Sequence, residues 1–86
     1  MLDKDENGFY SVDIKDARLS EVIEMLFEKF CEEWNGCGFC VLVNSDVKIL
    51  RTNFTEKNVE NILKKICSQN GCTCLLKDDV YYIFEA

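Results

Sequence analysis

The first regular pattern in the chain is an alternation of apolar and polar residues over positions 9–14. Tyr10, Val12 and Ile14 fall on one side of an extended chain, and the residues between them fall on the other side. A period of two residues is typical of a half-buried strand. The preceding residues, 1–8, are mostly polar, and they are predicted to form a flexible N-terminus that ends in a turn.

A helical period follows the first strand. Apolar residues recur at spacings of three and four and form one wide stripe: Leu19, Val22, Ile23, Leu26, Phe27, Phe30 and Trp34. Asp16 is the predicted N-cap, because its carboxylate can accept hydrogen bonds from the free backbone N–H groups of the first turn. Asn35-Gly36 is predicted to end the helix. Phe30 and Trp34 are expected to extend its core stripe, with an apolar anchor for a partner as the alternative.

Two further strands are predicted in the middle of the chain. Residues 39–43 form a short and wholly apolar run. Such a run indicates a strand that is covered on both faces or that lies at the centre of a sheet. Residues 44–46 are predicted to turn the chain. Residues 47–53 then form a weaker strand.

The last third of the chain predicts a second helix and a closing hairpin. Thr55 is the expected cap of the helix, and Asn70-Gly71 is its expected stop. The apolar positions of this helix again have helical spacing; they are Val59, Ile62, Leu63, Ile66 and Cys67. Residues 72–76 and 80–84 are predicted to be two strands joined by a polar turn. With two amphipathic helices and about five short strands, the fold class is α+β, with the helices packed together and covered by sheet.

The order and spacing of these segments resemble the secretin and TonB short N-terminal domain, the STN domain. The segments that carry the resemblance are Asp13-Ile14, Asp16-Ala17, Leu19, Asp46-Val47-Lys48, Asn53-Phe54-Thr55, Asn70-Gly71 and Val80-Tyr81-Tyr82-Ile83. They span residues 9–84, so residues 9–86 are expected to form one STN-like domain. The resemblance implies a β-α-β-β-α-β-β order, with two helices sandwiched between a two-stranded and a three-stranded sheet.

The resemblance also implies a function without catalysis. Domains of this family lie on the periplasmic side of the outer membrane in secretins and in transducing TonB-dependent receptors. There they dock protein partners of secretion or transport complexes, or pack into rings. A similar role is expected here, with the partner-binding residues left open, with no cofactor, and with a ring or other oligomer expected only in the context of a parent protein.

Composition limits the other classes of function. The chain has 86 residues, a formal net charge of −6 and no histidine. The negative charge argues against nucleic acid as the main partner, because the phosphate backbone of nucleic acid binds basic protein surfaces. No apolar run is long enough for a transmembrane helix, and residues 1–6 do not form a signal peptide. We therefore expect either a cytoplasmic protein or a segment of a longer secreted chain. No residue is singled out as catalytic, because no acid pair stands in a recognisable catalytic pattern.

The six cysteines leave an alternative open, because they are not a feature of the STN family. All six are disulfide candidates in a pairing that the sequence leaves undecided: Cys31, Cys37, Cys40, Cys67, Cys72 and Cys74. Four of these thiolates, from Cys37, Cys40, Cys72 and Cys74, match the number that tetrahedral zinc requires. The alternative function is therefore a small cysteine-rich zinc- or thiol-based protein. Reduced cysteines that pack as small apolar residues are the remaining interpretation.

Overall fold

The computed structural model describes residues 2–43 and 47–85 of the chain. The turn predicted at residues 44–46 lies outside the described residues. The elements follow in the order β1 (Leu2–Lys4), β2 (Tyr10–Arg18), α1 (Leu19–Lys29), the short 3₁₀ helix η1 (Cys31–Trp34), β3 (Gly38–Leu42), β4 (Lys48–Glu56), α2 (Val59–Gln69), β5 (Cys72–Lys77) and β6 (Val80–Glu85).

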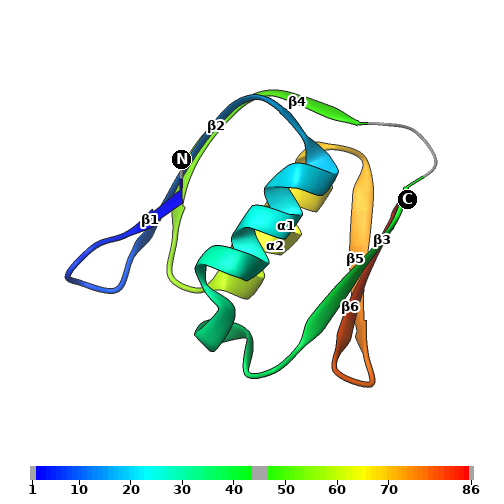
Figure 1. The fold of residues 1–86 in the computed structure, drawn as a ribbon. Helices are drawn as coiled ribbons and strands as arrows, with labels where there is room; N and C mark the ends of the chain where they lie inside the picture. The colour runs from blue at the N-terminus through cyan, green and yellow to red at the C-terminus, as the bar shows by residue number, and fades with distance from the viewer. Residues whose placement is uncertain (1, 44–46, 86) are drawn as a thin grey trace.

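The strands form two sheets, and Figure 1 shows both helices lying between them. The first sheet has the order β1-β2-β4 and is antiparallel throughout. The second sheet has the order β3-β6-β5, in which β3 runs parallel and β5 antiparallel to the central strand β6. The predicted α+β sandwich of two helices between two sheets is therefore confirmed. The first sheet has three strands where two were expected, because β1 adds to it.

Strand β1 replaces part of the flexible N-terminus that the sequence predicts for residues 1–8. Leu2 is only 3% exposed and pairs with Val12 of β2. The turn that follows is held by Asp5, whose carboxylate accepts hydrogen bonds from the backbone N–H groups of Asn7 and Phe9, both at 2.9 Å. A strand of three residues with one buried side chain is too short to produce a visible period, so pattern alone does not reveal it.

The connection between β2 and α1 differs from the prediction that Asp16 caps the helix. Strand β2 continues to Arg18, which occupies the N-cap position but does not cap the helix with its side chain. Asp16 lies within the strand with φ of 50°. This left-handed conformation interrupts the alternation, so that Ile14 and then Ala17 face the core while Asp16 stays exposed. Leu19 is the first core residue of the helix, as expected, and is 2% exposed.

Two large aromatic residues at the end of the first helical segment, Phe30 and Trp34, lie in the core. Helix α1 ends at Lys29, earlier than predicted, and η1 continues the chain to Trp34. Asn35 and Gly36 then reverse the chain with positive φ, as the sequence predicts. Phe30 and Trp34 are 6% and 4% exposed, which confirms that they extend the core.

Helix α2 is capped by a residue other than the predicted Thr55. Thr55 lies in β4, opposite Ser11 of β2. Asn58 is the N-cap instead, and its side-chain oxygen accepts a hydrogen bond of 2.8 Å from the N–H group of Asn61. Asn70 and Gly71 follow the last helical turn, as predicted. Long-range pairing with β2 thus extends β4 past the residue that local preference would choose.

Replacing the cap of α2 should lower stability by a modest amount. We expect Asn58→Ala to reduce the free energy of unfolding by about 1 kcal/mol, because the N–H group of Asn61 loses its acceptor. Asn58→Asp, which keeps an acceptor at the same place, should remain close to the wild type. Urea denaturation followed by circular dichroism measures both. Equal losses for the two variants would contradict the capping role.

The apolar run at residues 39–43 was expected to be covered on both faces or to lie at the centre of a sheet, and this is wrong. Strand β3 is an edge strand, and β6 is the centre of the second sheet. Leu42 is 55% exposed and Phe39 is 36% exposed. The second face of an all-apolar strand can be buried or exposed, and the sequence pattern is the same in both cases. Only the strand order distinguishes them.

Candidate functional site

The two sheets of the sandwich differ in the chemistry of their outer faces. The outward residues of β2 and β4 are polar or charged; they are Ser11, Asp13, Lys15, Arg51, Asn53 and Thr55. All six are exposed, while Val12 and Ile14 between them are buried. This arrangement is the usual one for a sheet that packs one face on a core and leaves the other in water.

The outer face of the second sheet is mostly apolar. In the central strand β6, Tyr81 and Ile83 are buried against the helices, so the residues that alternate with them point outward. The strand register places outward residues of β3 and β5 beside them. We call the resulting surface the outer apolar face; it consists of Cys40, Leu42, Leu75, Val80, Tyr82 and Phe84. The polar outward side chains of this sheet are Thr73 and Lys77.

No described element covers the outer apolar face, because both helices lie on the other side of the sheet (Figure 1). Leu42 and Leu75, at its two ends, are 55% and 54% exposed. Fully burying a leucine contributes about 1.5–3 kcal/mol, so covering the exposed half of each would contribute roughly 1 kcal/mol. Contiguous apolar patches of this kind mark interaction sites on soluble domains. This surface can therefore bind an apolar surface of another molecule.

The inner side of the same sheet contacts an aromatic cluster and one ionic group. Tyr81 packs edge-on against Trp34, and its hydroxyl donates a hydrogen bond of 3.0 Å to Glu60 of α2. Lys64 forms an ion pair of 2.8 Å with the same carboxylate. The hydrogen bonds from Lys64 and Tyr81 lower the pKa of Glu60, and burial raises the pKa of Tyr81 to about 12. Glu60 therefore stays ionised and Tyr81 stays neutral at neutral pH. Their hydrogen bond is a structural contact between α2 and β6.

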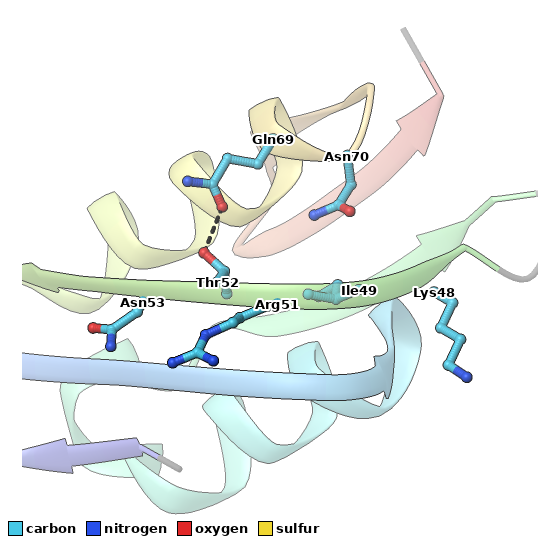
Figure 2. A pocket seen from close by; sticks show the side chains of 7 residues that line it. All are labelled: Lys48, Ile49, Arg51, Thr52, Asn53, Gln69 and Asn70. Atoms are coloured by element: carbon cyan, nitrogen blue, oxygen red, sulfur yellow. Dashed lines mark hydrogen bonds between the residues drawn. The ribbon is translucent and has the colours of Figure 1, made fainter.

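A hollow between β4 and the end of α2 is lined mainly by polar residues, and three of them make structural hydrogen bonds (Figure 2). The Thr52 hydroxyl donates a hydrogen bond of 2.7 Å to the side-chain oxygen of Gln69. Asn70 donates one of 2.7 Å to the carbonyl of Ile66 and so closes the helix end. In Figure 2, Lys48 and Arg51 point to the opposite side of β4 from Gln69 and Asn70. The charged and amide groups therefore do not converge on a common ligand position.

The candidate cysteines are not brought together as a metal site. Cys40 points to the outer face of the second sheet, whereas Cys72 and Cys74 pack toward the helices on its other side. Cys37 precedes β3 at the edge of the core. Among the described residues, no group of three or more cysteine or carboxylate side chains is arranged to hold a metal ion. The zinc alternative built on Cys37, Cys40, Cys72 and Cys74 is therefore not supported.

The disulfide candidates are all present as free thiols, including Cys31 on the exposed side of η1. Cys67 is buried in the core beside Cys74. Burial raises the pKa of the Cys67 thiol to about 12, which keeps it protonated and unreactive. This environment is the one that a cysteine has when it packs as a small apolar residue.

No known protein family, curated protein or solved structure matches the chain. None of the helices in residues 2–43 and 47–85 is long and apolar enough to cross a membrane.

Most residues of the outer apolar face were not identified from the sequence. A signal for them was present, because residues 80–84 are all apolar or aromatic and Cys74, Leu75 and Leu76 are apolar as well. A half-buried strand alternates, whereas these runs do not, so they indicate strands with two apolar faces. The sequence could not say which of these faces the helices cover.

Proposed function

We propose that this chain is a non-catalytic protein-interaction and assembly module, and that it docks a protein partner on its outer apolar face. The observation that carries the proposal is the contrast between the two outer faces of one sandwich. The first sheet presents six polar or charged residues to water, whereas the second sheet presents six apolar or aromatic residues and only Thr73 and Lys77 as polar ones among the described residues. A fold that covers its core from both sides does not require the second pattern, so we attribute it to binding.

The resemblance of the sequence to the STN domain also supports this proposal. Two helices between two sheets is the architecture that the resemblance implies, and the second helix and closing hairpin follow in the expected order. By this resemblance, we propose a place on the periplasmic side of the outer membrane, as part of a longer protein. The partner would belong to a secretion or transport complex.

The charge of the domain indicates the chemistry of that partner. The formal net charge is −6, and Asp78 and Asp79 lie in the exposed turn between β5 and β6, at one end of the outer apolar face. A negative field accelerates the approach of basic surfaces and disfavours acidic ones. We therefore propose a partner with an apolar contact surface bordered by lysine or arginine residues.

Site-specific photo-cross-linking tests this function in the cells that make the protein. A photo-reactive amino acid at Leu75 lies on the outer apolar face, and the same residue at Ser11 lies on the polar outer face of the first sheet. We expect a defined cross-linked protein from Leu75 and not from Ser11. A further substitution, Tyr82→Lys, places a charge at the centre of the face and should abolish the product. Absence of a product from Leu75, or identical products from both positions, would contradict the proposal.

A further inference from the structure

Three of the six cysteines lie together where α2 packs on β5. A hollow of about 230 Å³ is lined by residues of these two elements; they are Lys64, Cys67, Ser68, Cys72, Thr73 and Cys74. Lys64, Ser68 and Thr73 are exposed, so the hollow opens to solvent. A small reagent can therefore approach thiols that belong to two separate elements of the chain.

Two of these thiols are in contact with each other. The Cys67 thiol in α2 donates a hydrogen bond to the Cys74 sulfur in β5. The third thiol points to a different group, because the Cys72 Sγ atom donates to the carbonyl of Asn70 at 3.5 Å. Bridging two cysteines whose side chains point apart requires the backbone to move. Of the three thiols in the hollow, Cys67 and Cys74 are therefore the pair that can form a bond with the smallest movement.

The two paired thiols differ in access and in charge. Cys67 is 1% exposed, whereas Cys74 is only partly buried. Burial raises the pKa of the Cys74 thiol, but the ammonium group of Lys64 and the hydrogen bond from Cys67 oppose this effect by favouring the thiolate. Because the thiolate is the nucleophile of a cysteine, Cys74 is the member of the pair that meets an external reagent first.

We propose that Cys74 is a site of thiol–disulfide exchange and that Cys67 completes the reaction by forming a Cys67–Cys74 disulfide. The reagent is a low-molecular-weight disulfide such as oxidised glutathione. The Cys74 thiolate attacks one sulfur of the reagent, so that a mixed disulfide forms and one glutathione thiolate leaves. The Cys67 thiolate then attacks the Cys74 sulfur and releases the second glutathione. The two cysteine sulfurs lose two electrons, the reagent gains them, and the two thiol protons end on the two glutathione molecules.

The second step should be the slow one, because Cys67 must lose its proton in a buried environment. Burial raises the pKa of Cys67 to about 12, so little of its thiolate is present at neutral pH. The step is nevertheless intramolecular, since the mixed disulfide holds the sulfur to be attacked beside Cys67. The reaction should therefore be slow at neutral pH, should become faster as the pH rises, and should end in the bridge.

The bridge joins α2 to an edge strand of the second sheet, on the side that the helices cover. Cys74 packs toward the helices, so a bond there leaves the outer apolar face unchanged. The inference therefore goes beyond the proposed function and does not depend on it. Because the bond closes a short loop over residues 67–74, it restricts the unfolded chain. The oxidised protein should therefore unfold at a higher temperature than the reduced one.

Treatment of the full chain with oxidised glutathione tests the proposal. The reduced protein is incubated with the reagent, its remaining thiols are blocked, and it is digested with trypsin. Cleavage after Lys65 and Lys77 isolates residues 66–77, which contain Cys67, Cys72 and Cys74 and no other cysteine. We expect mass spectrometry to show the loss of two hydrogen atoms from this fragment, and we expect reductant to reverse the loss. The undigested oxidised protein should show the higher unfolding temperature.

Three variants, each checked for folding by circular dichroism, assign the bond to its two sulfur atoms. Cys74→Ser should remove the bridge, because the attacking thiol is gone. Cys67→Ala should stop the reaction at the mixed disulfide, so that the fragment carries one glutathione. Cys72→Ser is the matched control from the same hollow, and it should keep the bridge. A wild-type fragment without a bridge, a bridge that survives in Cys74→Ser or Cys67→Ala, or its loss in Cys72→Ser would overturn the proposal.

Discussion

Replacing Trp34 with alanine is expected to reduce the free energy of unfolding by about 3–5 kcal/mol, the range for deleting a large buried aromatic residue. Trp34 is 4% exposed and stacks on Phe27 of α1 with ring centroids 3.9 Å apart. It also packs edge-on against the ring of Tyr81 in β6, with the ring centroids 5.2 Å apart. The side chain therefore joins the first helical segment to the central strand of the second sheet, and its removal opens a cavity between them.

The matched variant is Trp34→Phe, which keeps an aromatic ring in the stack. It loses the hydrogen bond from the indole N–H group to the carbonyl of Leu26, 3.3 Å long, together with part of the ring volume. We expect a loss of about 1–2 kcal/mol for this variant. Far-ultraviolet circular dichroism in a urea titration measures both, since Trp34 is the only tryptophan and its fluorescence disappears with it. A loss below about 1 kcal/mol for Trp34→Ala would contradict the packing described.

The second large effect is expected at the start of α1. Leu19→Ala should reduce the free energy of unfolding by about 2–5 kcal/mol, because Leu19 is 2% exposed and its truncation leaves a cavity. The backbone N–H group of the same residue donates a hydrogen bond of 2.8 Å to the carbonyl of Val47. Leu19 thus anchors the helix where the first sheet ends.

Met25→Ala serves as the control for this position. Met25 is 44% exposed on the same helix, so its truncation should cost less than about 1 kcal/mol. The two variants are compared by the same urea titration. A loss under about 0.5 kcal/mol for Leu19→Ala would show that the side chain does not anchor the helix.

The core stripes of the two helices could be read from the sequence alone. Leu19, Val22, Ile23 and Leu26 were predicted from spacing and are all buried, and the apolar positions of α2 are buried as well. A period of 3.6 residues repeated over three turns is a local property, and a helix with one apolar side has only one way to bury it. The α+β sandwich follows from the same reasoning, because two such helices need sheet on both sides.

The caps were not predictable in the same way. Asp16 and Thr55 have side chains that favour helix starts, but both lie in strands that pair along most of their length. Pairing of β2 with β4 joins segments about 40 residues apart, and hydrogen bonds across that distance outweigh the small local preference of a single cap. Asn58 and Arg18 occupy the N-cap positions because the strands end where they do.

The sequence by itself determined which segments are apolar, and the tertiary structure decided which of their faces stay in water. Residues 39–43 and 80–84 are similar apolar runs, yet β6 became the central strand and β3 an open edge. Strand order depends on contacts between distant segments, and these leave no local period. The outer apolar face, on which the proposed function depends, therefore became visible only once the sheet was assembled.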